Sequence, residues 1–105
     1  MATNRLEILK QMVDQDPKNA FARYGLAMEY ANSGSLEEAV TEFGQLIRQD
    51  PNYCAAYFHG GQALEKLGRL EEARTTYEQG IEAATRKGDA HTRAEIEAAL
   101  STLPL

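Results

Sequence analysis

The chain has 105 residues, enough for one domain with a modest core and too few for a large enclosed active-site cavity. Hydrophobic residues make up 43% of it and charged residues 26%, which is ordinary for a soluble globular protein. The net charge of −5 argues against binding to nucleic acid, whose phosphates require a basic surface, and against attraction to anionic membranes.

The amino-terminal stretch MATNRLEILKQMVDQD contains no continuous apolar run, and nothing later approaches the ~20 apolar residues of a membrane span. We therefore expect no secretory signal and no membrane insertion. The single cysteine, Cys54, excludes an internal disulfide and a cysteine-rich metal site. Together these features predict a cytoplasmic protein.

The first predicted helix covers residues 4–16. Leu6, Leu9 and Val13 follow helical spacing along it, and Met12 lies beside them. This segment aligns with the second half of the repeated unit described next, so we expect a helix that lacks its usual hairpin partner. Apolar surface left uncovered at this end would favour pairing of two copies.

The middle of the chain repeats itself. The stretch GSLEEA begins at Gly34 and returns as GRLEEA at Gly68, 34 residues later. In the same register, the Asp-Pro pair at residues 16–17 falls on the Asp-Pro pair at residues 50–51. One register maintained over this length indicates a duplication, with units at residues 18–51 and 52–85.

Each unit is predicted to be two helices joined by a tight turn. Apolar residues recur at helical spacing before Gly34 and again after it, and neither segment alternates as a strand would. Gly34 and Gly68 suit the left-handed backbone that ends a helix. Pro17 and Pro51 mark the other boundary, because proline cannot continue a helix.

A last helix is predicted within residues 86–105. The stretch KGD breaks the preceding helix, and Asp89 is a suitable N-cap. The segment after it carries one apolar stripe, made of Thr92, Ile96, Ala99, Leu100 and Leu103. Such a helix would cover the open end of a helical stack, and it brings the expected total to about six helices.

The 34-residue period and the residues at its key positions resemble the tetratricopeptide repeat (TPR) family. In the first unit the resemblance is carried by Leu26, Ala27, Tyr30, Ala39, Phe43 and Pro51. In the second unit it is carried by Tyr57, Gly61, Leu64, Ala73 and Tyr77. The resemblance implies an all-α fold in which antiparallel helix hairpins stack into a right-handed superhelix, or α-solenoid.

Three positions depart from the family's pattern. Arg23 stands where a large aromatic residue is expected, Gly60 where a large aliphatic residue is expected, and Thr85 where a closing proline is expected. These departures affect the expected packing and leave the family resemblance intact. We interpret residues 1–105 as one TPR domain, with a half-repeat helix at 1–17, repeats at 18–51 and 52–85, and a capping helix at 86–105.

The sequence contains no recognisable catalytic or metal-binding constellation. His59 and His91 fall in different predicted helices without a second ligand or a nucleophile at a suitable spacing. The Glu-Glu pair that opens the second helix of each unit favours the positive end of the helix dipole. Gly60 and Gly61 lie inside a helix, where close approach of two helices explains them better than a phosphate loop. We therefore expect a protein that is not an enzyme and that has no cofactor and no metal.

The resemblance implies a concave groove, lined by the first helix of each hairpin, that holds a peptide or a partner helix. The residues expected on this face are Phe21, Tyr24, Met28, Asn32, Ala55, Phe58, Gln62, Glu65 and Lys66. Tyr24 and Phe58 occupy the same repeat position and are the favoured binding residues. For Phe21 and Met28 the alternative is that they pack as extra core. The lysines and asparagines with which some TPR domains grip a terminal carboxylate are absent from the matching places.

These observations predict a non-catalytic module that binds a protein or peptide partner. The alternative is a self-associating unit, a homodimer whose groove or amino-terminal face is covered by the second copy. In the first case substitution of Tyr24 or Phe58 should abolish partner binding without affecting the fold.

Overall fold

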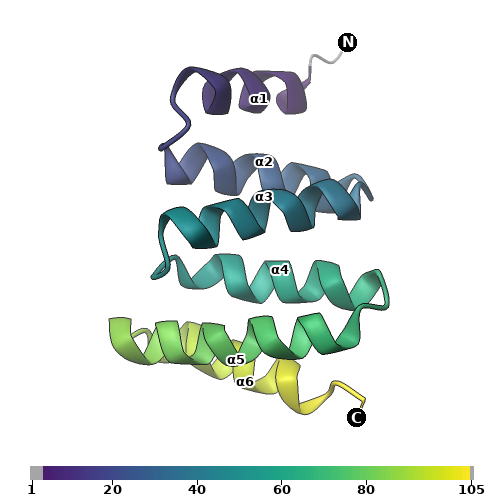
Figure 1. Cartoon of the computed structure of the whole chain (residues 1–105), viewed down its shortest axis with the longest axis vertical. Helices are drawn as coiled ribbons and strands as arrows, with labels where there is room; N and C mark the ends of the chain where they lie inside the picture. Colours follow the sequence, from purple (N-terminus) through teal and green to yellow (C-terminus); the bar gives the residue numbers. More distant parts are fainter. Residues whose placement is uncertain (1–3, 105) are drawn as a thin grey trace.

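The computed structural model describes residues 4–104, which form six α-helices and, within that range, no strand. The helices are α1 (Arg5–Gln15), α2 (Ala20–Asn32), α3 (Leu36–Gln49), α4 (Cys54–Lys66), α5 (Leu70–Lys87) and α6 (Ala90–Ser101). Each helix packs on the one before it, so the chain runs back and forth down the long axis of the molecule from α1 to α6 (Figure 1). This confirms the predicted all-α stack of helix hairpins.

The helices form two layers with different spacing. In one layer α2 lies against α4, and α4 lies against α6. In the other layer, among the described residues, the backbones of α1, α3 and α5 make no close approach to one another. A stack that is tighter on one side curves toward that side, so α2, α4 and α6 form the concave layer and α1, α3 and α5 form the convex layer.

The turn inside each repeat is built in the same way. Gly34 has φ +86° and Gly68 has φ +78°, the left-handed backbone that glycine adopts without a steric penalty. In both turns the next residue donates its backbone N–H to a carbonyl of the preceding helix: Ser35 to Tyr30 and Arg69 to Leu64, each at 2.9 Å. The GSLEEA and GRLEEA stretches therefore form the same turn, as predicted.

The second repeat ends differently from the first. Helix α5 has 18 residues whereas α3 has 14. Thr85 stands where a proline would interrupt the helix, so α5 continues to Lys87 and ends only at Gly88, whose φ is +75°. Asp89 then caps α6 as predicted, because its side chain accepts the backbone N–H of Thr92 at 3.0 Å.

The interior consists of three apolar clusters strung along the stack, centred on Val13 and Leu26, on Phe43 and Leu46, and on Tyr77 and Ile96. The largest completely buried side chains are Tyr77, Phe43, Leu46 and Ile96. Because the core is distributed along the stack in this way, each repeat depends on the neighbour that covers it.

Three helical glycines, Gly60, Gly61 and Gly80, allow helices to touch closely. A Cβ at Gly61 would overlap the ring of Tyr77, and a Cβ at Gly80 would lie 2.5 Å from the Cβ of Tyr57. A Cβ at Gly60 would lie 3.2 Å from the Cβ of Phe43. The prediction that Gly60 and Gly61 serve close helix approach is confirmed.

Candidate protein-interaction surface

The residues expected on the groove face lie on α2 and α4 of the concave layer, with very different exposure. Phe21 is the most exposed large apolar side chain among the described residues, at 77% of its full accessible area. Met28 is half-buried and packs against the cluster around Phe43. The alternative that Phe21 is extra core is therefore wrong, whereas for Met28 it is partly correct.

Tyr24 and Phe58 are brought together by a third ring, that of His59. The ring centroid of His59 lies 5.9 Å from that of Tyr24 and 5.1 Å from that of Phe58. Tyr24 also lies 5.3 Å from the ring of Tyr53 and 6.3 Å from that of the buried Phe43. Tyr24 thus belongs partly to the core, and its replacement would disturb the fold as well as the surface, contrary to the sequence-based expectation.

His59 is the residue of this surface that the sequence analysis did not assign to it. Ala55, His59 and Gln62 follow one another at i, i+4 and i+7, so helical spacing alone could have placed His59 on the same face. Burial lowers the pKa of His59, and a hydrogen bond with Gln62 and the charge of Glu95 on α6 only partly offset that effect. His59 is therefore a neutral ring at pH 7, suited to packing against aromatic groups.

The polar residues of the predicted groove differ in how far they are exposed and in whether they already bind another residue of the chain. Glu65 accepts a hydrogen bond from the hydroxyl of Tyr77, and burial, together with this bond, raises the pKa of Tyr77. Glu65 is therefore already engaged inside its own repeat. Asn32 and Lys66 are exposed near the carboxyl ends of α2 and α4, whereas Ala55 is half-buried near the start of α4. The accessible polar groups thus lie at one end of an aromatic and apolar surface.

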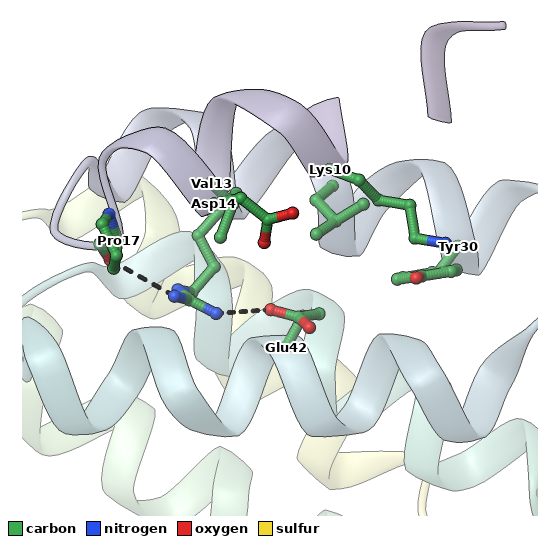
Figure 2. A pocket seen from close by; sticks show the side chains of 8 residues that line it. Lys10, Val13, Asp14, Pro17, Tyr30 and Glu42 are labelled. Carbon is green, nitrogen blue, oxygen red and sulfur yellow. Dashed lines mark hydrogen bonds and ion pairs between the residues drawn. The ribbon is translucent and has the colours of Figure 1, made fainter. Parts of the chain in front are cut away.

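The opposite, convex layer contains a polar cleft between α1 and α3, above α2, with a volume of about 330 Å³ (Figure 2). Arg23 is 9% exposed at its base. Its guanidinium Nη1 donates to the carboxylate of Glu42 at 2.6 Å, and Nη2 donates to the carbonyl of Pro17 at 3.2 Å. Figure 2 shows Pro17 and Glu42 at the two ends of these bonds. The ion pair explains how a charged residue occupies a core position where the family's pattern has an aromatic ring.

The described residues also bear on metal binding, on membrane crossing and on thiol chemistry. Within residues 4–104 no three histidine, cysteine, aspartate or glutamate side chains gather to hold a metal ion. No helix in that range combines the length and apolar character needed to cross a membrane. Cys54 is buried, and burial raises the pKa of its thiol, which makes it a poor nucleophile at neutral pH.

Comparison with known proteins agrees with this architecture. The sequence pattern of the family described as tetratricopeptide repeat matches residues 24–90. A TPR repeat-containing protein of Pseudomonas aeruginosa is 33% identical over 98 residues, which cover 93% of this chain and 93% of that protein. The solution structure of a tetratricopeptide repeat domain protein from Salinibacter ruber is 35% identical, with a TM-score of 0.78, and covers 84% of this chain and 89% of its own.

A more distant structure shares the fold alone. The TPR2B domain of yeast Sti1, solved as a complex with pHsp70, has 20% sequence identity and a TM-score of 0.86, covering 91% of this chain and 77% of its own. The family pattern spans more than half of the chain, and the Pseudomonas aeruginosa relative aligns along 93% of it. The chain is a member of the tetratricopeptide repeat family.

Proposed function

We propose that this protein is a non-catalytic interaction module that binds a peptide or helix of a partner protein on its concave layer. The observation that carries the proposal is the aromatic surface formed by exposed Phe21 and half-buried Tyr24, Phe58 and His59 on α2 and α4. Aromatic side chains with one free face are enriched at recognition surfaces, because they offer a large contact area at a small cost in conformational entropy.

Structures of the same fold support this class of function. The TPR2B domain of Sti1 was solved with pHsp70, and the structure of PcrH, with a TM-score of 0.88, contains the chaperone-binding region of PopD. Both are 20% identical to this chain, so they support the use of the fold for partner binding and say nothing about which partner this chain binds.

The partner's chemistry follows from the surface. An apolar or aromatic side chain would pack beside Phe21 and Met28, and hydrogen-bonding groups would meet Asn32 and Lys66 at the other end of the helices. With Tyr24, Met28, Phe58 and Gln62 at its centre, the surface does not suit the capture of a bare terminal carboxylate. We place the protein in the cytoplasm, where its free thiol, Cys54, would remain reduced.

The test uses Phe21, which is the cleanest probe because its side chain contributes little to the core. The Phe21→Ser and Phe58→Glu variants are compared with the wild type for capture of proteins from the source cell, identified by mass spectrometry. Ile8→Ser is the matched control, since it removes an exposed apolar side chain from α1 in the other layer. We expect the same partner to be lost from both concave-layer variants and kept by the control. A partner that survives Phe21→Ser and Phe58→Glu contradicts the proposal.

Self-association is the second candidate function, and it has its own supporting observation. Ile8 is 52% exposed and Met12 is 40% exposed, both on α1. Met12 aligns with the completely buried Leu46 of the first repeat, so its exposure reflects a helix face that no described helix covers. An uncovered apolar pair of this kind favours association with another apolar surface.

A further inference from the structure

Glu95 of α6 occupies the same place in its helix as His59 does in α4. Each residue lies six positions after the N-cap of its helix, Tyr53 in α4 and Asp89 in α6. In α4 this position faces the preceding helix of the concave layer, because the ring of His59 lies 5.9 Å from that of Tyr24 on α2. Since α6 lies against α4 in the same layer, Glu95 is expected to face α4 and its aromatic residues.

The charge of Glu95 acts on the aromatic surface. Burial raises the pKa of the Tyr24 hydroxyl most, and interactions with Tyr53 and Glu95 raise it further. The charge of Glu95 also partly offsets the lowering of the pKa of His59 by burial. A carboxylate from α6 therefore influences rings that belong to α2 and α4. The side chain of Glu95 is 44% exposed, so this carboxylate is accessible to a bound molecule.

Among residues 4–104, no arginine or lysine pairs with Glu95. The one basic group near its carboxylate is Nε2 of His91, at 3.7 Å. An imidazole is positive only when it is protonated, so at pH 7 this contact does not neutralise Glu95 as an arginine would. The neighbouring Glu97 differs, because Nε of Arg93 pairs with its carboxylate at 3.0 Å. Glu95 thus keeps its negative charge without a fixed cation.

The other charged groups of the predicted groove do not compensate Glu95. Glu65 is a second carboxylate, and it is already bonded to the hydroxyl of Tyr77. Lys66 lies seven residues beyond His59 on α4, about 10 Å further along the helix axis. The middle of the concave layer therefore combines aromatic rings with a net negative charge.

Aromatic rings beside a free carboxylate suit a basic side chain. The face of an aromatic ring attracts a cation, most often that of arginine. A guanidinium is planar, so it stacks on a ring and can donate two hydrogen bonds to one carboxylate, while its apolar stem packs along neighbouring rings. An acidic side chain would be repelled by Glu95, and an apolar side chain would cover the carboxylate without offering it a hydrogen bond.

We propose that the partner segment bound on the concave layer presents an arginine whose guanidinium pairs with Glu95 and whose stem lies against Phe58 and His59. The arginine site rests on the proposed function and adds the chemical class of the partner, a basic peptide or helix that also offers an apolar residue to Phe21. Phe58→Glu should still abolish partner capture, because loss of an aromatic contact outweighs what an added exposed ion pair returns.

The probe is a library of random peptides displayed on phage, each of about 16 residues and so long enough for four helical turns. The library is selected on the full wild-type chain and on the Phe21→Ser, Glu95→Gln and Glu97→Gln variants. We expect peptides enriched on the wild type to prefer arginine at one position, to be lost on Phe21→Ser and to lose that preference on Glu95→Gln. Glu97→Gln is the matched control and should keep the preference, because Arg93 already pairs with the carboxylate that it removes.

The affinity of one enriched peptide measures the size of the contact. Replacing its arginine with citrulline keeps the shape and removes the charge, and it should weaken binding to the wild type roughly fivefold to tenfold. The same replacement should weaken binding to Glu95→Gln by about threefold or less, because only the contact with the rings remains. Glu95 is exposed, so thermal unfolding of Glu95→Gln should match that of the wild type.

The other outcomes separate the arginine site from the proposed function. Peptides that bind the wild type and not Phe21→Ser, but show no preference for arginine, overturn the arginine site and leave the proposed function standing. A preference for arginine that survives Glu95→Gln has the same meaning. If no peptide is enriched, or if the enriched peptides bind Phe21→Ser equally well, the proposed function is contradicted and the arginine site with it.

Discussion

The two repeats share one backbone plan but fill equivalent interior positions with different residues. In the first repeat the fully buried Leu46 of α3 accompanies Arg23 on α2. In the second repeat the equivalent positions hold Gly80 and Tyr57, and the missing side chain lets the tyrosine ring lie directly against the backbone of α5. The space at the position of Leu46 is taken in the second repeat by Tyr57 and by Ile96 of α6, whose Cδ1 would lie 2.9 Å from a Cβ at Gly80. The residue tolerated at one repeat position therefore depends on the side chains that face it from the neighbouring helices.

Arg23 and Tyr57, which occupy equivalent positions, donate a hydrogen bond to equivalent backbone carbonyls. In the first repeat Arg23 donates to the Pro17 carbonyl and is neutralised by Glu42. In the second, the hydroxyl of Tyr57 donates to the Pro51 carbonyl at 2.6 Å, and Thr76 stands where Glu42 would be. The arginine that departs from the family's pattern therefore keeps the hydrogen bond of the aromatic residue and requires a carboxylate in addition.

Placing the leucine of the first repeat at the equivalent position of the second should have the largest effect on the free energy of unfolding. Gly80→Leu introduces the residue of the equivalent position 46, but its Cβ would lie 2.5 Å from the Cβ of Tyr57 and 2.9 Å from Cδ1 of Ile96. We expect a loss of about 3 kcal/mol or more in the free energy of unfolding, because overpacking against a buried ring cannot be relieved locally. Urea denaturation measures it. Gln79→Leu, one residue earlier and exposed, should change stability by less than about 0.5 kcal/mol.

Breaking the ion pair of the first repeat should have the next largest effect. Glu42→Ala leaves a buried guanidinium unpaired, and we expect a loss of about 2–3 kcal/mol. This is below the usual 3–5 kcal/mol because the side chain of Glu42 is 22% exposed and water can partly replace it. Glu97→Ala, which removes an exposed pair with Arg93, should cost about 0.5 kcal/mol or less.

The double variant Arg23→Tyr, Glu42→Thr gives the first repeat the residues of the second at both positions. A tyrosine at position 23 can donate to Pro17 as Tyr57 donates to Pro51, so the double variant should lie within about 1 kcal/mol of the wild type. Denaturation of the two single variants and the double variant measures the coupling. If the double variant loses as much free energy of unfolding as the two single variants together, positions 23 and 42 are not energetically coupled.

A smaller effect is expected from Gly61→Ala, although the first repeat has alanine, Ala27, at this position. Tyr77 lies where the new methyl group would stand, and its ring is completely buried, so the ring must shift. The strain exceeds the gain in helix propensity, for a net loss of about 1–2 kcal/mol. Gly25→Ala is the control: its Cβ would meet only Leu9, with Cδ2 at 3.1 Å and Cδ1 at 3.8 Å, the end of a flexible and half-buried side chain. Thermal unfolding of both variants tests the difference.

The smallest expected effect is on how the stability of the fold depends on pH. Burial lowers the pKa of His59 from its ordinary value of 6.5, so the unfolded chain takes up a proton at a higher pH than the folded chain does. The stability that neutral His59 contributes is present above about pH 6.5 and is lost as the pH falls toward the lower folded-state pKa. The His59→Gln variant should lose less stability than the wild type over this interval. His91→Gln, at an exposed position on α6, should behave like the wild type.

Local structure was largely predictable from the sequence. The 34-residue register, the left-handed glycines at positions 34 and 68, and the N-cap at Asp89 are each determined by a few neighbouring residues. The family resemblance supplied the order of the hairpins. The longer α5 also follows from a local cause, the threonine at position 85 in place of proline.

The candidate surface was less predictable, because exposure depends on which helix lies opposite. Phe21 and Tyr24 are three residues apart on α2, yet one is free and the other packs beneath Tyr53 and His59. Helical spacing places both on adjoining faces but does not say how far α4 extends over them. The sequence alone determined the repeat, its turns and its helices, since these arise from contacts between near neighbours in the chain. The tertiary structure decided the burial of Arg23 and the aromatic group around His59, since each requires side chains from three helices to meet.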